Sequence, residues 1–294
     1  MNESAPLLLH KRRRQFKDRL SFGLVCFFST VTLLPLFLIL WDLFSKGFKQ
    51  FDIKLFTEVA PTSMEAMLAR MSGEAIPGGM LNGLTGTLLM LGMAVLMAIP
   101  TGLAAGIYLA ENQGKPLSTW VRNLSELLQG VPSIVIGVVV YIWVVRPMSS
   151  YSALAGSVAL AFMMLPMIIR STEESLKMLP SSLKEAGLAL GGSYTAVVLR
   201  ILLPAAFGGL FTGSLLAVSR VMGETAPLLV TALGAAYVNG NPLQPSSSLS
   251  LLIWEFYNDP NLLPLVWSTS LLLLLLVLSI NLAAKSISKR WKIQ

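Results

Sequence analysis

The sequence predicts an all-α membrane protein with six transmembrane helices and with both termini in the cytoplasm. Three observations lead to this fold class. Hydrophobic residues make up 54% of the chain and charged residues only 13%, whereas about a quarter of the residues of a typical soluble domain are charged. Several apolar runs reach about 18 residues or more, which is enough to cross a hydrocarbon core of about 30 Å. Lys and Arg are also distributed unequally between the two sides of these runs.

The first transmembrane helix is expected over residues 21–46, after a basic cytoplasmic N-terminus at residues 1–20. Its apolar run, Ser21–Trp41, is too long for the core of a signal peptide and lacks a small-residue cleavage pattern. We therefore expect this helix to be retained. A mixed polar loop on the outer side is expected over residues 47–79.

The other five spans are expected within a core at residues 80–284, which a cytoplasmic tail at residues 285–294 follows. We expect these spans at Leu81–Ala110, Leu124–Val145, Ser152–Ile169, Phe207–Ala236 and Leu262–Ala284. Two of them are about 30 residues long and contain a proline, Pro100 or Pro227. A proline inside a span of this length predicts a tilted or broken helix.

The distribution of basic residues sets the orientation. Of the 22 Lys and Arg residues, 16 lie in segments that this topology places in the cytoplasm and five in outer segments, while Arg220 lies within a span. Cytoplasmic segments carry an excess of Lys and Arg, so both termini are expected to be cytoplasmic. The same clustering at the ends of spans argues against nucleic acid as a partner, despite the net charge of +7.

The outer segment at residues 237–261 contains SSSLSLLIWEFYNDP, whose apolar part is too short to span a membrane. With Trp254 and Tyr257, it fits a helix that lies at or dips into the outer interface. It fits equally well a capped helix, within a loop, that covers the bundle.

Composition excludes most catalytic and metal-binding chemistry. The chain has one cysteine, Cys26, within an apolar run, and one histidine, His10, in the polar N-terminus. Disulfides, Cys-based or His-based zinc sites and a His-containing catalytic triad are therefore not available. We expect no catalytic residue, no metal site and no cofactor on this chain.

The cytoplasmic segment at residues 171–206 contains the amphipathic sequence KEAGLALGGSYTAVVLRILLP. Ser182 and Glu185 are three residues apart, as in a capping box, which predicts the start of a helix. Gly191 supplies the permissive backbone that ends a helix, and Ser193 begins a second one. Two short helices at an angle are therefore expected between two spans.

These helices are expected to present the small residues Ala186, Gly187 and Ala189 to the cytoplasm. Small residues let another protein approach closely, and an amphipathic helix laid in a groove is a common docking mode. The segment is therefore predicted to dock a partner. An ordinary amphipathic connector is the simpler alternative.

The same segment resembles the cytoplasmic loop of permeases from ATP-binding-cassette importers. In that family the pattern is Glu-Ala-Ala, three residues, Gly, nine residues and Ile-x-Leu-Pro. The corresponding positions in this sequence are Glu185, Ala186, Gly187, Gly191, Ile201, Leu203 and Pro204. Gly187 is the one departure, because the family has a second alanine there. The resemblance implies a MetI-like permease fold and a coupling helix that docks into a cleft of a nucleotide-binding subunit.

The chain contains no phosphate-binding loop of the form G-x-x-x-x-G-K-[ST]. The energy for transport is therefore expected to come from a partner or from an ion gradient. The resemblance implies a partner ATPase that binds ATP and Mg, and a chain that is not itself an enzyme.

The stretch AVSRVMGETAPLL places two charges, Arg220 and Glu224, within an apolar span. They are four residues apart and would share a helical face, with Arg220 about 20 Å along a span that starts near Phe207. A charge at depth costs about 2.5–3.5 kcal/mol on insertion scales. Either the two charges neutralise each other, or Arg220 faces a pathway for an anion and Glu224 holds it in place. Gly223 and Pro227 flank the site, where a broken helix would open.

Together with PGGMLNGLTGTLLM, AIPTGLAAGIYLAE and LLQGVPSIVIGVV, the sequence RVMGETAPLL resembles permeases of the phosphate-specific import system. The resemblance runs from about Gly78 to the C-terminus and is weaker over the first 75 residues. It implies that Arg220 and Glu224 take part in phosphate passage.

The resemblance also implies partners, in a bacterial inner membrane: a second PstC-type permease, two copies of a cytoplasmic ATPase and a periplasmic protein that delivers inorganic phosphate. A phosphate-signalling regulator is a further candidate partner.

Two other charges are weaker candidates for function. Arg170 is a candidate pathway residue, although a topology charge in a salt bridge with Glu173 or Glu174 is the alternative. Glu126 is expected at the start of the third span, where a carboxylate stabilises a helix N-terminus. We therefore expect a structural role for Glu126.

Three further functions remain as alternatives. The first alternative is a permease for another oxyanion (sulfate, molybdate or phosphonate), which the stretch R-x-x-G-E-T-A-P disfavours. Another is an ion-coupled secondary transporter with Glu224 as a proton site, which the coupling motif and the lack of a detectable inverted repeat disfavour. A signalling scaffold that senses the state of the transporter would be a second role.

Overall fold

The computed structural model describes the backbone of residues 4–291 and the side chains of residues 17–286. In this part of the chain the regular elements are helices, as expected for an all-α protein. Five described helices are long and apolar enough to cross a membrane, and a pair of helices that meet at a sharp bend adds a sixth when the pair is counted as one broken span. The prediction of six spans is thus confirmed, with one span broken. Most basic side chains of the predicted N-terminal segment and C-terminal tail lie outside the described residues.

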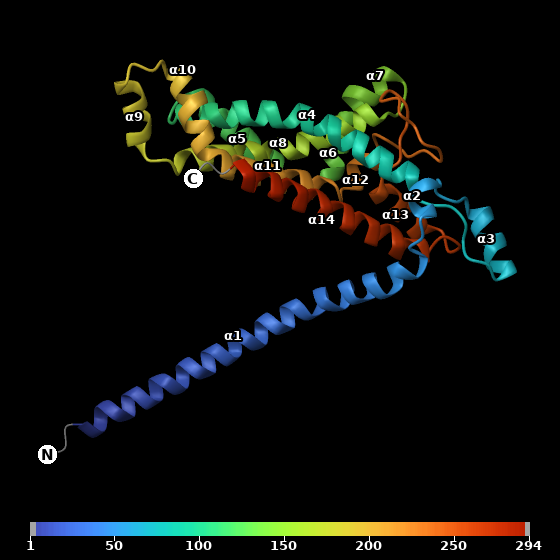
Figure 1. The fold of residues 1–294 in the computed structure, drawn as a ribbon, viewed down its shortest axis with the longest axis horizontal. Coiled ribbons are helices and arrows are strands. Elements are labelled where there is room, and N and C mark those ends of the chain that lie inside the picture. Colours follow the sequence, from blue (N-terminus) through green and yellow to red (C-terminus); the bar gives the residue numbers. More distant parts are fainter. Residues whose placement is uncertain (1–3, 292–294) are drawn as a thin grey trace.

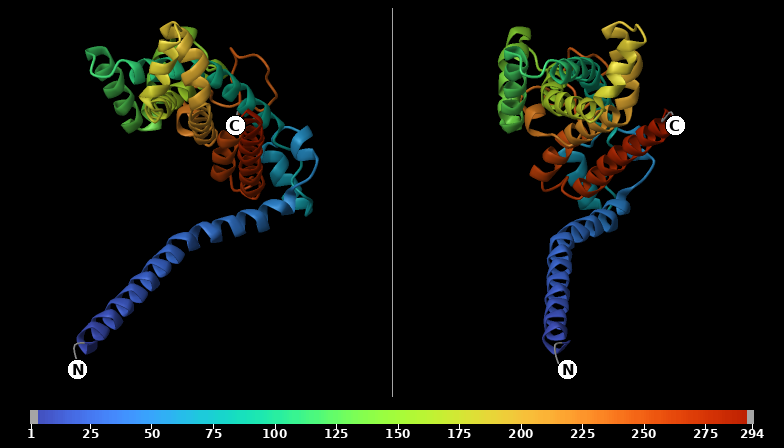
Figure 2. Two further views of the ribbon diagram at one scale, coloured as in Figure 1. Left: turned by 60° about the vertical axis from the view of Figure 1, so that its left-hand side comes forward. Right: turned by 90° about the vertical axis from the view of Figure 1, so that its left-hand side faces the viewer.

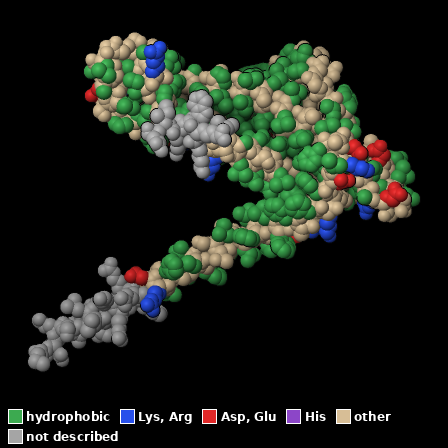
Figure 3. Space-filling model, in the orientation of Figure 1, with side chains coloured by type: hydrophobic (Ala, Val, Ile, Leu, Met, Phe, Trp, Pro, Cys, Tyr) green, Lys and Arg blue, Asp and Glu red, His purple; other side chains and the backbone are tan. Residues whose placement is uncertain are grey.

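Helix α1 (Ser4–Gly47) leaves the rest of the molecule at an angle (Figure 1, Figure 2). It contains the expected first span and one proline, Pro35. Its side chains from residue 17 to residue 38 are exposed, and apolar groups cover much of its visible surface (Figure 3). Only its C-terminal end contacts the bundle, where a Cβ atom on Gly47 would lie 2.9 Å from Leu271 Cβ of α14 (Leu265–Trp291).

The outer segment after α1 contains three short helices, η1 (Phe48–Gln50), α2 (Lys54–Thr57) and α3 (Ser63–Ser72). Helix α3 begins with a capping box, in which the Thr62 hydroxyl accepts a hydrogen bond from Glu65 N at 3.4 Å and the Glu65 carboxylate accepts one from Thr62 N at 2.8 Å. Thr62 N and the Thr62 hydroxyl (at 3.0 Å) both donate to the Glu65 carboxylate, and these two hydrogen bonds hold the pKa of Glu65 below its ordinary value, because they stabilise the ionised form.

The core of the bundle is the pair α4 (Leu81–Glu111) and α8 (Ala153–Lys177), which form the most extensive helix contact in the described residues. Glycines allow this close approach: a Cβ atom on Gly102 would lie 2.7 Å from Ile168 Cγ2, and one on Gly106 would lie 2.4 Å from Thr172 Cβ. Helix α4 continues through Pro100, so the break considered there is absent. The packing of α4 on α8 holds the helix together around a proline whose own side chain is exposed.

The third span differs from the expected helix at Leu124–Val145. Helix α5 (Pro116–Gly130) and the helical stretch Ser133–Met148 meet at an angle of 109°. The second arm consists of α6 (Ser133–Val140), the π-helical turn η2 (Tyr141–Val145) and α7 (Arg146–Met148). Pro132 lacks an N–H group and has extended backbone (φ −56°, ψ 138°), which ends the helical hydrogen bonding after Gly130.

Glu126 therefore does not begin a span. It lies in the second half of α5, so the interpretation as a helix N-terminal carboxylate is wrong. The bend places the start of a new helix after it, at Ser133.

The fifth span is also interrupted. Helix α10 (Tyr194–Val197), the π-helical turn η3 (Val198–Leu202) and α11 (Leu203–Val221) run on from one another and end before the expected limit at Ala236. A break follows, then the single turn α12 (Ala226–Leu229), which packs against α6. A Cβ atom on Gly137 of α6 would lie 2.7 Å from Pro227 Cα, so the glycine is needed for this contact.

The outer segment before the last span contains α13 (Leu249–Asn258), whose first turn is capped by the Ser248 hydroxyl accepting from Leu251 N at 3.1 Å. Leu252 and Phe256 are buried, and α13 packs against α4 and α14. The structure therefore favours the capped helix that covers the bundle over a helix lying in the interface.

Candidate functional site

Arg220 lies in the last turn of α11 and crosses to the middle of α8, where its Nη1 atom is 3.6 Å from Met167 Sδ. Met167 is the fifteenth of the 25 residues of α8. At about 1.5 Å per residue, it lies roughly 21 Å along a helix of about 36 Å. Arg220 therefore lies beside the middle of α8, near the midpoint of the bundle.

Arg220 and Glu224 do not form a salt bridge, and no described carboxylate pairs with Arg220. The helix ends at Val221, so Glu224 has already left the helical face that carries Arg220. The expected neutralisation of one charge by the other, and the expectation that Glu224 holds Arg220, therefore both fail for this structure. The Arg220 side chain is exposed, whereas Glu224 is half-buried.

The helix break beside Arg220 is held from the outer side by α13. Ser250 Oγ donates a hydrogen bond to the Glu224 carbonyl oxygen at 2.9 Å, and the Thr225 hydroxyl donates to the Ser250 carbonyl oxygen at 3.5 Å. Glu224 N in turn donates to Val221 O at 3.1 Å. Ser250 is buried, so the carbonyl that the broken helix leaves unpaired is satisfied inside the protein.

Arg170 lies nearer the cytoplasmic end of α8, where its Nε atom donates to Glu174 Oε1 at 2.8 Å. Both side chains are more than half exposed. The salt bridge considered for Arg170 is thus present, and its role in a pathway stays a prediction.

A cavity of about 200 Å³ beside Arg170 is also lined by Arg122 and Glu173. The Glu173 carboxylate is 8% exposed and accepts from Arg122 of α5 and Lys177 of α8, each at 2.5 Å. The ion pair between Arg122 and Glu173 could not be predicted from the sequence, because 51 residues separate the two partners.

Helix α9 (Ser181–Ala189) projects from one end of the bundle, away from α3 (Figure 1). It begins after Pro180 without a side-chain cap, so the capping box expected at Ser182 and Glu185 is absent. It ends as expected, with Gly191 in the left-handed region at φ +80°. The Ser193 hydroxyl then accepts from Ala196 N at 3.3 Å and begins α10.

The residues of the predicted coupling motif divide into two groups. Glu185 and Ala186 are exposed, as are Leu188, Ala189 and Leu190. Gly187 is buried against α10 and η3, where a Cβ atom would lie 2.8 Å from Ile201 Cδ1 and 3.0 Å from Val197 Cγ2. The expectation that Gly187 belongs to the exposed small-residue surface is therefore wrong. Ile201 and Leu203 are half-buried, and Pro204 is exposed in the first turn of α11.

One further polar group links α9 to the bundle. The carboxylate of Glu111, the last residue of α4, accepts hydrogen bonds from Lys184 of α9 and from Tyr194 of α10. No local sequence pattern marks Glu111, since its partners lie 73 and 83 residues further along the chain.

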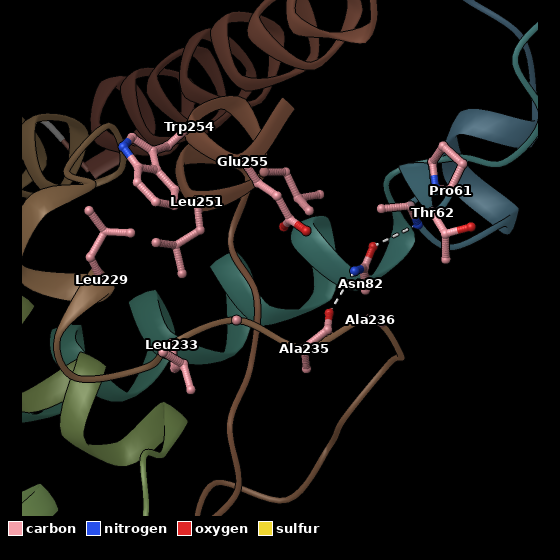
Figure 4. A pocket seen from close by; sticks show the side chains of 13 residues that line it. Pro61, Thr62, Asn82, Leu229, Leu233, Ala235, Ala236, Leu251, Trp254 and Glu255 are labelled. Atoms are coloured by element: carbon pink, nitrogen blue, oxygen red, sulfur yellow. Dashed lines mark hydrogen bonds between the residues drawn. The ribbon is translucent and has the colours of Figure 1, made fainter. Parts of the chain in front are cut away.

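At the other end of the bundle a cavity of about 400 Å³ lies between α4, α13 and the loop after α12 (Figure 4). Asn82 of α4 is buried there and joins two loops, since its Oδ1 accepts from Ala60 N at 3.1 Å and its Nδ2 donates to Ala235 O at 2.8 Å. Glu255 of α13 points into the cavity (Figure 4). Burial and the nearby Asp259 raise the pKa of Glu255 above its ordinary value.

Comparison with known proteins defines the class first. Residues 102–293 match the family described as binding-protein-dependent transport system inner membrane component. Inward-facing structures of the MetNI methionine ABC transporter share the fold. The match with one of them covers 71% of this chain and 94% of the other chain, with a TM-score of 0.62 and 22% identity. The match with another covers 79% of this chain and 100% of the other chain, with a TM-score of 0.59 and 21% identity. The fold is that of an ABC importer permease, as the resemblance implied.

Curated relatives narrow the class. The phosphate transport system permease protein PstA of Xylella fastidiosa (strain Temecula1) is 37% identical over 97% of this chain and 96% of the relative. PstA of Yersinia pestis is 36% identical over 99% of this chain and 98% of the relative. The probable PstA of Methanocaldococcus jannaschii is 32% identical over 92% of this chain and 93% of the relative. The chain therefore belongs to the PstA family of phosphate transport system permeases. It is a multi-pass protein of the inner membrane that works with a partner permease and with ATPase subunits.

Proposed function

We propose that this chain and a second, PstC-type permease line a membrane pathway for inorganic phosphate. A periplasmic binding protein delivers the phosphate, and two cytoplasmic ATPase subunits, which bind ATP and Mg, drive the transport. A phosphate-signalling regulator is a further partner of the assembly. The observation that carries the proposal is the position of Arg220, at the midpoint of the bundle and without a described carboxylate partner.

The chemistry of Arg220 suits this substrate. A guanidinium group keeps its charge and can donate two parallel hydrogen bonds to the oxygens of phosphate. An unpaired charge within a membrane normally faces a bundle interior or a water-filled path. Because Arg220 is exposed on this single chain, its surface has to be completed by another subunit, and the second permease meets that need.

The broken backbone beside Arg220 supports the same role. Transporters place irregular backbone at the membrane midplane only where it is buried in protein or lines a cavity. Here the break at residues 222–225 is fixed by Ser250 on one side, and Arg220 extends from the other. Arg170, whose partner Glu174 is exposed, lies closer to the cytoplasm and is proposed as a second point of contact along the path.

Transport of phosphate by membranes that contain the assembly tests the role of Arg220. R220Q removes the charge and keeps a hydrogen-bonding side chain, so uptake should fall to the background level while the subunits still assemble. R146Q, at an exposed arginine in α7, is the matched control and should transport normally. Near-normal uptake by R220Q would refute the role of Arg220 in the pathway.

A further inference from the structure

We propose that Glu111 and Tyr194 are positioning residues of the coupling between ATPase and membrane helices. The Glu111 carboxylate joins α9 to the cytoplasmic end of α4, so that the two helices move as one unit. This inference rests on the proposed function, because it takes α9 as the element that contacts the ATPase.

The geometry places two donor groups around one carboxylate oxygen. Oε2 of Glu111 accepts a hydrogen bond from Lys184 Nζ and another from Tyr194 Oη. Lys184 Nζ also lies 5.0 Å from the centroid of the Tyr194 ring, within the range of a cation–π contact. The Glu111 side chain is only 11% exposed, against 34% for Lys184. An ion pair so shielded from water is screened less by salt than an exposed one.

Besides this ion pair, α9 is attached by apolar packing, both to the segment that follows it in the chain and to a cluster shared with the long helices. Gly187 packs against Val197 and Ile201, which belong to α10 and η3. Leu183 packs into an apolar cluster that α4, α8 and α11 share with this segment. Among the described residues, Lys184 makes the ion pair that connects α9 to a long helix of the bundle.

A glycine after α9 gives its connection to α10 a permissive backbone. Gly191, two residues beyond the last residue of α9, adopts φ +80°, whereas Gly187 packs closely against Ile201. Leu190, which directly follows α9, is 89% exposed. Without the Glu111 link, a push on this residue would tilt α9 about Gly191 and leave α4 in place. With the link, the push moves α4.

Helix α4 connects this link to the site at Arg220. The α4 helix packs closely on α8 through Gly102 and Gly106, and α8 carries Met167, against which Arg220 lies. A contiguous set of packed elements therefore joins α9 to the midpoint of the bundle. Contiguity alone does not demonstrate energetic coupling, so the test measures coupling directly.

The experiment uses the complete assembly, reconstituted in vesicles with its binding protein. The measured quantities are the stimulation of ATPase activity by phosphate and the phosphate transported per ATP hydrolysed. E111Q and K184Q should each lower both quantities by at least about fivefold, the lower end of typical coupling effects. Co-purification of the ATPase should stay normal. Y194F, which removes one hydroxyl, should show a smaller loss in the same direction.

The charge-exchange variant E111K/K184E restores the ion pair with its polarity reversed. It should recover much of the coupling that either single charge change loses, which a merely structural role of each residue would not produce. D42N, which breaks the exposed ion pair between Asp42 and Lys46 in α1, is the matched control and should behave as wild type. Wild-type coupling in E111Q would overturn the inference. So would a loss of coupling in E111K/K184E as large as the losses in E111K and K184E added together.

A second measurement does not depend on the substrate. Amide hydrogen exchange at residues 181–189 should accelerate in E111Q and Y194F and stay unchanged in D42N. If the wild-type assembly shows no stimulation by phosphate, the proposed function fails, while the exchange rates still decide whether Glu111 holds α9. Unchanged exchange in both variants would refute the link itself.

Discussion

Gly187 of α9 lies directly against Ile201 of η3, so close that a Cβ atom on the glycine would stand 2.8 Å from Ile201 Cδ1. Both positions belong to the motif that identifies the coupling segment, and the contact shows that they pack against each other. The glycine that departs from the usual Glu-Ala-Ala pattern is therefore explained by packing inside this chain and not by the surface offered to a partner.

Substitution of Gly187 tests this contact. G187A should be tolerated with a small loss of stability, since the atom it meets first is the flexible end of Ile201. G187W should displace α9 and reduce the phosphate-stimulated ATPase activity to the basal rate. The double variant G187A/I201V, which removes the crowding methyl group, should recover the stability lost by G187A. Normal coupling in G187W would show that α9 does not depend on this packing.

The Glu185 side chain is exposed on the cytoplasmic helix α9. A substitution of Glu185 should therefore weaken the binding of a partner and leave folding unchanged. E185K should lower the amount of ATPase that co-purifies from membranes, while the yield of this chain stays the same. D18K, which makes the same change of charge at an exposed position of α1, is the control. Equal recovery of the ATPase in both variants would remove the assignment of α9 as the docking element.

The contact between α4 and α8 should tolerate no added side chain at Gly106, where a Cβ atom would lie 2.4 Å from Thr172 Cβ. G106V should therefore lower the thermal stability of the purified chain, by about 1–3 kcal/mol if the core adjusts. G92A is the matched control on the same helix, because no atom lies within 4 Å of a Cβ atom there. Equal melting temperatures for the two variants would contradict the packing described.

The pKa of Glu255 is raised by burial first and by Asp259 second. The folded state therefore retains a proton on this side chain at pH values where the unfolded state has lost it. Stability contributed by the protonated form is complete below the ordinary value of 4.5 and is lost as the pH rises through the raised pKa. E255Q should melt at a higher temperature than wild type near neutral pH.

The difference between E255Q and wild type should shrink as the pH falls towards 4.5, since wild-type Glu255 is then protonated as well. Thermal unfolding of both proteins between neutral pH and pH 4.5 measures this difference in melting temperature. The pKa of Asp259 is shifted in the opposite direction, because hydrogen bonds from Ser63 and from Asn261 N lower it. D259N should therefore destabilise the protein near neutral pH. A constant difference between E255Q and wild type would contradict the raised pKa.

Hydropathy predicted the number and the approximate positions of the spans, because the cost of exposing polar backbone to lipid restricts each span to a helix. It could not predict the angle of 109° within the third span. Gly130 and Pro132 are in the sequence, yet Pro100 is compatible with a continuous helix in α4. Whether a proline interrupts a span depends on its neighbours in space.

The candidate site shows the same limit. The spacing of Arg220 and Glu224 predicted one helical face only on the assumption that the helix continues, and it ends at Val221. The ion pairs of Glu173 and Glu111 join residues 51 and 73 positions apart. Such pairs depend on how the helices pack, which no local pattern contains. The coupling motif was recognisable because its residues lie close together in the sequence.

The central claim is that this chain is the phosphate-conducting permease of an ATP-driven assembly. The most direct test reconstitutes the assembly purified through this chain, with the binding protein, and measures ATPase activity and uptake with phosphate or sulfate as substrate. We predict that a second permease and an ATPase co-purify, and that phosphate, unlike sulfate, stimulates both activities. Transport by this chain alone without ATP, or equal stimulation by sulfate, would contradict the account.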